Sequence, residues 1–159
     1  MIRVGERLPQ VSLARLRGEI VEHVPLEPYL EGRRVVMIGL PGAFTPVCTQ
    51  RHIPELVANA GSLKASGIDE IICVAPNSPW VVAEWSRQTA PEGRLTFLSD
   101  GNLELTRAAG LSSKAPHLFL GECSMRYALM LRHAVIEKIA VEPDVENLAC
   151  TRPVKFVEI

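Results

Sequence analysis

Short apolar runs alternate with amphipathic segments along most of the chain. Residues 35–40 form a partly β-branched apolar run, too short for a helix, between Gly-Arg-Arg and Pro-Gly. From residue 45 to about residue 64, apolar residues recur at helical spacing, and Gly67 supplies a stop signal. The pattern therefore predicts a buried strand followed by an amphipathic helix.

The same order of elements repeats twice more. Residues 71–75 form a second fully apolar run, after which Ser78 and Pro79 suit the N-cap and first position of a helix that includes residues 80–85. Residues 95–98 predict a third strand, followed by a turn-rich Ser-Asp-Gly-Asn and a short helix over 103–109 that ends at Gly110.

The last regular pattern consists of two β-capable runs, 126–132 and 134–141, which predict an antiparallel hairpin. Alternating strands and helices followed by a hairpin indicate an α/β sandwich with a mixed sheet. No linker, repeat or low-complexity tract interrupts the pattern, and the length suits one hydrophobic core. We therefore expect a single domain over residues 1–159.

Composition and charge narrow the possible functions. Apolar residues make up 47% and charged residues 22% of the chain, which is usual for a globular protein, and the net charge is −1. There is no basic patch for nucleic acid, no apolar run long enough to span a bilayer, and no signal-peptide pattern at the N-terminus. We expect a cytoplasmic protein that binds neither nucleic acid nor membrane.

The four cysteines, Cys48, Cys73, Cys123 and Cys150, are widely spaced and form no CxxC pair. This spacing argues against a zinc ribbon and against a thioredoxin-type dithiol, and no metal site is expected. In a reducing compartment such thiols are reactive groups or buried fillers.

Cys48 has the most informative surroundings. Thr45 suits the N-cap of the predicted helix and Pro46 its first position, so Cys48 is the third helical residue, where a capping box carries Glu or Gln. Free N–H groups and the helix dipole at this place favour a thiolate. The Thr45 hydroxyl can donate to the sulfur or to a substrate oxygen, and Pro41 can shield the turn. The alternative is that Cys48 is a buried filler.

The string Pro41-Gly-Ala-Phe-Thr45-Pro-Val-Cys48 resembles the signature Pro-x-x-x-Thr/Ser-x-x-Cys of the peroxiredoxins, and its fuller form is similar to the type five group, which includes plant type II enzymes. Matches continue through His52-Ile-Pro, Asn77-x-Pro, Asp100-Gly-Asn, Arg126-Tyr-Ala and Val141-Glu-Pro. The resemblance implies a thioredoxin-like three-layer α/β/α sandwich and a thiol peroxidase for hydrogen peroxide and alkyl hydroperoxides, without a cofactor.

The resemblance also implies residue roles. Cys48 matches the peroxidatic cysteine that becomes a sulfenic acid, Thr45 and Pro41 complete its pocket, and Arg126 matches the active-site arginine. A guanidinium can stabilise both a thiolate and the developing negative charge. His52 lies on the same helix face as Cys48, where we expect packing or hydrogen bonding rather than metal binding.

A second thiol must reduce the sulfenic acid, and three sources stay open. Cys73 resembles the resolving cysteine of plant type II members, but it lies in an apolar strand, which favours a filler. Cys150, in Leu-Ala-Cys near the C-terminus, resembles the resolving cysteine of atypical two-cysteine mammalian members. An external thiol, from glutathione, glutaredoxin or thioredoxin, is the third.

Two departures from the family pattern bear on recycling. Cys123 stands where bacterial relatives often carry an arginine, and we expect it to be an exposed thiol. Pro153 is expected to interrupt any helix in the tail over 151–159.

The resemblance also implies a homodimer formed through the face around the site, with Phe44 as a contact. A peroxide sensor or a chaperone-like binding protein on the same fold is the alternative function.

Overall fold

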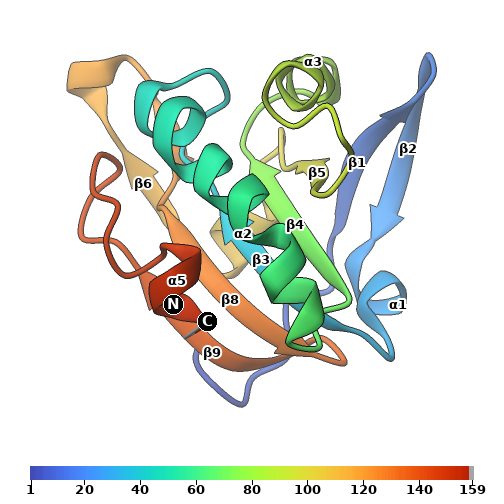
Figure 1. Ribbon diagram of the computed structural model, residues 1–159. Helices are drawn as coiled ribbons and strands as arrows, with labels where there is room; N and C mark the ends of the chain where they lie inside the picture. The colour runs from blue at the N-terminus through green and yellow to red at the C-terminus, as the bar shows by residue number, and fades with distance from the viewer. Residues whose placement is uncertain (158–159) are drawn as a thin grey trace.

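A seven-stranded mixed sheet forms the centre of the computed structural model, which describes residues 1–157 (Figure 1). In the order in which they lie across the sheet, the strands are β2 (Ile20–Pro25), β1 (Ser12–Arg17), β5 (Thr96–Ser99), β4 (Glu70–Ala75), β3 (Arg34–Gly39), β8 (Tyr127–Arg132) and β9 (Val135–Val141). The strands β3, β4 and β5 run parallel to one another, whereas β8 pairs antiparallel with β3, and β1 antiparallel with β5.

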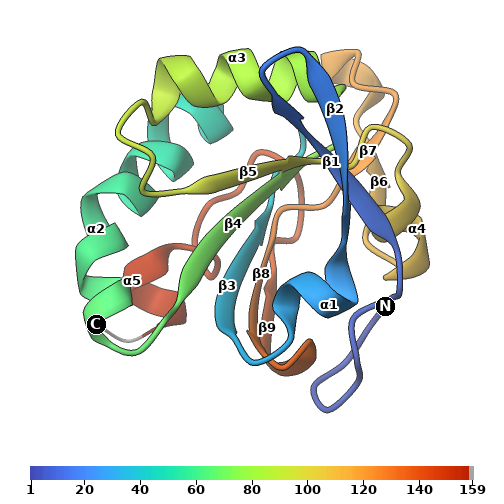
Figure 2. The same ribbon diagram turned by 90° about the vertical axis from the view of Figure 1, so that its right-hand side faces the viewer.

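Helices cover both faces of the sheet, so that the fold has three layers. The helices are α1 (Leu26–Leu30), α2 (Ile53–Ala65), α3 (Pro79–Thr89), α4 (Glu104–Ala108) and α5 (Pro153–Phe156), with a π-helical turn η1 (Cys48–His52) and a 3-10 turn η2 (Pro116–Leu118). Figure 2 shows α2 and α5 on one side of the sheet and α4 on the other. Residues of α2, α3 and α5 share one apolar core, and residues of α1 and α4 share the second.

Alternation along the central strands fills the two cores. In β3, Val36 and Ile38 face α2, whereas Val35 and Met37 face the opposite side. Side chains of a strand point alternately to the two faces, which is why a strand buried on both sides appears as a continuous apolar run. The strands predicted at 35–40, 71–75 and 95–98 are confirmed, as is the mixed α/β class.

The predicted hairpin and helix signals are also confirmed. His133 and Ala134 join β8 to β9 as a two-residue turn in which both have positive φ, as right-twisted hairpins require. Ser78 caps α3 by accepting a hydrogen bond from the Val81 N–H, at 3.3 Å. Gly110 follows α4 with a φ of +68°.

Gly39, at the end of β3, lets two strands approach closely beside the site. It pairs with Tyr127 of β8, and a Cβ atom at this position would lie 1.9 Å from the Tyr127 ring. No side chain other than hydrogen fits there. The contact fixes the end of β3, and the segment that leads to Cys48, against the start of β8.

Some elements have no counterpart in the sequence predictions. The β1–β2 hairpin lies at a sheet edge and carries charged residues such as Arg15 and Glu22, which mask its apolar alternation. A second, two-stranded sheet consists of β6 (Ser112–Lys114) and β7 (Glu122–Ser124), which are too short for a periodic signal. Within residues 1–157, the helices are all too short or too polar to traverse a bilayer.

The prediction that Pro153 interrupts a helix in the tail is wrong. Pro153 is the first residue of α5, where a proline costs nothing because the first N–H of a helix has no partner within it. Phe156 of this helix is buried in the core that includes α2. The predicted absence of a terminal helix also concerned residues 158–159, which lie outside the described part of the chain.

Candidate active site

A tight turn leads from β3 into the helix that carries Cys48. Phe44 adopts a φ of +62°, and the Thr45 carbonyl then accepts the first helical hydrogen bond, from the Thr49 N–H at 3.0 Å. The predicted helix start at Thr45 is confirmed. The Thr45 hydroxyl donates to the Gly42 carbonyl at 2.7 Å, so it stabilises the turn and does not contact the Cys48 sulfur.

The helix begins as an α-helix at Pro46 and Val47 and then makes one π-helical turn, which the sequence patterns do not predict. Over η1 (Cys48–His52), the Ile53 N–H donates to the carbonyl of Cys48, five residues back. Pro54 has no N–H to offer the Gln50 carbonyl, and its ring crowds that carbonyl, so a regular α-helix cannot continue here. Single π-helical turns occur often at functional sites.

Arg126 is placed against Cys48 by its position in the sheet. It directly precedes β8. Tyr127, the first residue of β8, faces the opposite core, so Arg126 points toward the helix that carries Cys48. Its Nη1 donates to the Cys48 sulfur at 3.3 Å and contacts Nδ1 of His52 at 3.1 Å, while Nη2 donates to the Val145 carbonyl at 2.8 Å. A fixed cationic donor therefore lies directly against the Cys48 sulfur.

One N–H group of the buried Arg126 guanidinium donates no hydrogen bond within residues 1–157. Arg126 is 1% exposed, and its Nε–H has no hydrogen-bond partner among residues 1–157. A buried donor without a partner carries a substantial free-energy penalty, which a ligand oxygen could remove. Arg126 therefore has the means to hold an oxygen next to the sulfur.

His52 is fully buried and neutral. Burial, and then the charge of Arg126, lower the pKa of His52 to about 3. Its Nε2 lies 3.2 Å from the Thr151 carbonyl, which can only accept, so Nε2 carries the proton and Nδ1 is free to accept from Arg126. The predicted hydrogen-bonding role of His52 is confirmed. Among residues 1–157, no cluster of three or more His, Cys, Asp or Glu side chains could hold a metal ion.

A small pocket of about 80 Å³ lies over the helix start. Its one cation is Arg126, and Leu118, Leu120 and Val145 give it apolar walls. The remaining lining residues belong to the motif segment or to the loop beside it: Pro41, Thr45, Pro46, Val47 and Glu146. The pocket therefore joins the motif to Arg126, as expected for a site that admits a small polar molecule with an apolar substituent.

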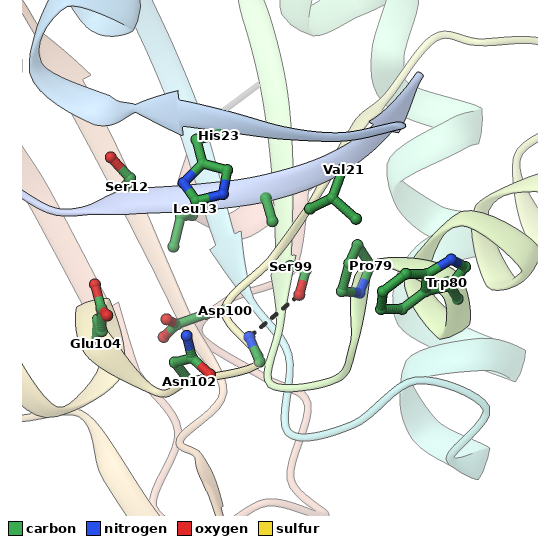
Figure 3. A pocket seen from close by; sticks show the side chains of 12 residues that line it. Ser12, Leu13, Val21, His23, Pro79, Trp80, Ser99, Asp100, Asn102 and Glu104 are labelled. Carbon is green, nitrogen blue, oxygen red and sulfur yellow. Dashed lines mark hydrogen bonds between the residues drawn. The ribbon is translucent and has the colours of Figure 1, made fainter. Parts of the chain in front are cut away.

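A larger cavity, of about 270 Å³, lies between the β1–β2 hairpin and the loop after β5 (Figure 3). None of the motif residues lines it. Its buried polar groups are already engaged: the Asp100 carboxylate accepts from the N–H and hydroxyl of Thr106, and the Ser99 hydroxyl accepts from the Gly101 N–H. This cavity is larger than the pocket over the helix start, but its buried polar groups serve the structure of the loop.

Cys73 and Cys123 are both buried. Cys73 lies in β4 and is 1% exposed, and burial raises the pKa of its thiol. Cys123 lies in β7, packs with Ala115 and Val145, and is also 1% exposed. The prediction that Cys123 is an exposed thiol is therefore wrong, because the β6–β7 ribbon folds that side chain inward.

Cys150 is the exposed cysteine of the four. Its Sγ is 3.5 Å from the Val141 carbonyl, so it does not contact Cys48 in this structure. Burial, and then the neighbouring Glu142 carboxylate, raise the pKa of the Cys150 thiol. The structure thus brings together Pro41, Thr45, Cys48 and Arg126, and leaves Cys150 outside that group.

Comparison with known proteins identifies the family. Residues 3–153 match the Redoxin family model. Peroxiredoxin-2E-2, chloroplastic, from Oryza sativa subsp. japonica is 38% identical over 148 residues, covering 89% of this chain and 65% of the relative. The chain belongs to the peroxiredoxin family. It spans less than two thirds of the length of this chloroplastic relative.

Solved peroxiredoxins share the fold. The crystal structure of reduced Prx3 in complex with H2O2 from Vibrio vulnificus has a TM-score of 0.92 and 31% identity, covering 99% of this chain and 98% of that one. Peroxiredoxin 5 from Alvinella pompejana has a TM-score of 0.81 and 30% identity, covering 91% and 92%. The type five resemblance and the thioredoxin-like fold are confirmed.

Two buried residues of this peroxiredoxin, Glu142 and Thr151, are not indicated by the sequence patterns. The Thr151 carbonyl contacts His52 Nε2, and the Glu142 carboxylate accepts from the Thr151 hydroxyl. A carboxylate directly after a strand and close in sequence to a cysteine is the available signal, but it does not by itself distinguish a buried acid from an exposed one.

Proposed function

We propose that this peroxiredoxin reduces hydrogen peroxide and alkyl hydroperoxides by nucleophilic attack of the Cys48 thiolate. The observation that carries the proposal is the 3.3 Å contact between Arg126 Nη1 and the Cys48 sulfur, in which both residues are buried and Arg126 also lines a small pocket. The similarity to reduced Prx3 from Vibrio vulnificus, which was crystallised in complex with H2O2, supports the same substrate class.

The reaction needs only an anionic sulfur and donors for the peroxide oxygens. The thiolate bonds to the terminal oxygen, the O–O bond breaks, and the other oxygen leaves as hydroxide or alkoxide, which takes a proton from water. Cys48 is then a sulfenic acid. Arg126 stabilises the charge as it moves from sulfur to the leaving oxygen, and its free Nε–H suits this role.

Cys150 is the internal thiol best suited to resolve the sulfenic acid. Its attack on the Cys48 sulfur forms the S–S bond and releases water. Cys73 and Cys123 lie in strands at 1% exposure, which gives them little freedom to move, whereas Cys150 is exposed and follows a loop. An external thiol reductant would then return both cysteines to thiols. The reductant would be either the pair of glutathione and glutaredoxin, or thioredoxin.

A single-turnover experiment tests the function. We expect the fully reduced protein to consume one equivalent of hydrogen peroxide, and mass spectrometry after digestion to find a peptide pair joined by a Cys48–Cys150 disulfide. No consumption of peroxide would reject the peroxidase. A Cys48 sulfenic acid or mixed disulfide, without the internal disulfide, would assign resolution to an external thiol.

Two variants complete that experiment. Cys150→Ser is expected to stop at the sulfenic acid, whereas Cys73→Ser is expected to form the Cys48–Cys150 disulfide as the parent protein does. The reverse pattern would make Cys73 the resolving residue. Oxidation of Cys48 that no thiol reductant reverses would favour a peroxide sensor over an enzyme.

We also propose that a second copy of the chain covers the rim of the pocket. Exposed apolar side chains gather on the segments beside it, at Phe44, Leu118 and Phe119, and Phe119 is 95% exposed. Such a patch is costly in water. We expect sedimentation to give twice the mass of the chain, and Phe119→Asp to shift the protein toward the monomer. A monomeric parent protein would contradict the proposal.

A further inference from the structure

The buried carboxylate of Glu142 holds the chain on both sides of Cys150. Glu142 is 4% exposed, and its Oε1 accepts hydrogen bonds from the Ala149 N–H at 2.7 Å, the Thr151 N–H at 2.9 Å and the Thr151 hydroxyl at 2.9 Å. Burial alone raises the pKa of Glu142, but these hydrogen bonds outweigh it, so its pKa lies below the usual value. The charged form is therefore the one that binds the segment.

A closed ring of hydrogen bonds connects Glu142 and Thr151 to His52 and Arg126 of the active site. The carbonyl of Thr151 is the partner of His52 Nε2, and His52 Nδ1 accepts from Arg126. The Glu142 N–H in turn donates to the Arg126 carbonyl at 2.9 Å. His52, Thr151 and Arg126 are each at most 1% exposed, so water does not replace any of these partners.

We propose that Glu142 is a positioning residue which docks the Cys150 segment and, through that segment, holds Arg126 in place beside Cys48. The proposal rests on the proposed function, in which Cys150 is the resolving thiol. It adds that the docked segment is part of the peroxide site, and that the Glu142 hydrogen bonds set how readily the segment leaves.

The covalent geometry of a disulfide makes the two roles of the segment exclusive. Cys150 is exposed and its Sγ contacts the Val141 carbonyl, whereas Cys48 is fully buried against Arg126, so an S–S bond between them requires the Cys150 segment to move. Ala149 and Thr151 then leave the Glu142 oxygen, because they flank the residue that moves. His52 loses its carbonyl partner, and Arg126 loses a fixed acceptor.

Because the segment cannot be docked and form the disulfide at the same time, docking is predicted to have opposite effects on two steps: oxidation of Cys48 by peroxide and formation of the Cys48–Cys150 disulfide. The docked segment favours attack on peroxide, because it fixes the guanidinium, and it delays the disulfide, because docking must be undone first. Coupling of this kind is reciprocal, so a change that loosens the segment weakens the peroxide site. Glu142 thus sets the lifetime of the sulfenic acid.

Stopped-flow fluorescence can separate the two steps. Trp85 donates to the Thr49 hydroxyl in the turn that carries Cys48, at 3.1 Å, and so reports on that turn. The peroxide-dependent phase gives the oxidation rate, and the phase independent of peroxide gives the disulfide rate. Glu142→Ala is expected to lower the first about tenfold and to raise the second about tenfold, as loss of charge-assisted hydrogen bonds implies.

Graded variants separate positioning from loss of structure. Glu142→Gln keeps an acceptor oxygen and should give rates between those of the parent protein and Glu142→Ala. Thr151→Val removes only the hydroxyl donor, so it should change both rates in the same directions as Glu142→Ala but by a smaller factor. Thr151→Ser keeps the hydroxyl and should have the rates of the parent protein. Glu122→Gln, which breaks an exposed pair with Arg107, is the matched control and should leave both rates unchanged. A general loss of structure would not produce opposite changes.

The outcomes decide each part of the proposal. An unchanged oxidation rate in both Glu142→Ala and Thr151→Val would show that Glu142 does not position Arg126. An unchanged or slower disulfide phase would show that it does not restrain Cys150. If the parent protein forms a sulfenic acid but no internal disulfide, the resolver assignment and the restraint fail together, and the oxidation rate, measured in a Cys150→Ser background, alone decides the positioning role.

Discussion

Replacing Cys48 by serine is expected to slow the reaction with hydrogen peroxide by roughly 10⁴-fold or more, because a neutral hydroxyl does not supply the nucleophile that a thiolate does. The side chain is buried and the change removes little volume, so we expect the fold to persist. Stopped-flow consumption of peroxide by the reduced protein gives the rate constant, and circular dichroism checks the fold.

The matched control is Cys73→Ser, a buried thiol in β4 whose loss should leave the rate constant unchanged. Rapid peroxide consumption by a folded Cys48→Ser protein would remove Cys48 from the reaction. It would also leave the 3.3 Å contact with Arg126 as a structural hydrogen bond only.

Arg126→Met is expected to lower the same rate constant by about 10²- to 10³-fold, the usual cost of removing a donor that stabilises charge in a transition state. Methionine fills much of the arginine volume without its charge or donors. The sulfur then loses its adjacent cation, and the peroxide oxygen loses the Nε–H donor. The loss should appear in the second-order rate constant for oxidation.

Arg126→Lys distinguishes charge from geometry. An ammonium group keeps the positive charge but cannot contact Cys48, His52 and the Val145 carbonyl at once, so we expect only partial recovery. Full activity of the lysine variant would show that charge alone suffices. Full activity of Arg126→Met, with the fold intact by circular dichroism, would overturn the role proposed for this residue.

Local chemistry explains what the sequence could predict. Ser78 and Pro79 begin α3, and the apolar runs of β3 and β4 are strands, because each signal acts within a few residues of itself. The helix start at Thr45 is likewise local, and it places Cys48 correctly as the third helical residue.

What the sequence could not predict depends on contacts between distant segments. The sequence pattern places Cys123 at the surface, yet Val145 and Ala115 enclose it once β6 and β7 pair. The role of Arg126 follows from a family resemblance, because nothing within its own strand indicates a partner 78 residues away. Glu142 escapes prediction for the same reason: its carboxylate is recognisable only by the three donors that converge on it.

The π-helical turn divides the long helix into two parts that differ in how firmly they are held. Beyond Pro54, α2 is anchored by Leu56 and Leu63 in the core. Before it, the Gln50 carbonyl has no donor four residues ahead, since proline has no N–H. We therefore expect the turn that bears Cys48 to open as a separate unit, while α2 remains folded against the sheet. In the proposed reaction, a single proline would then allow the buried sulfur to reach a second thiol without unfolding of the domain.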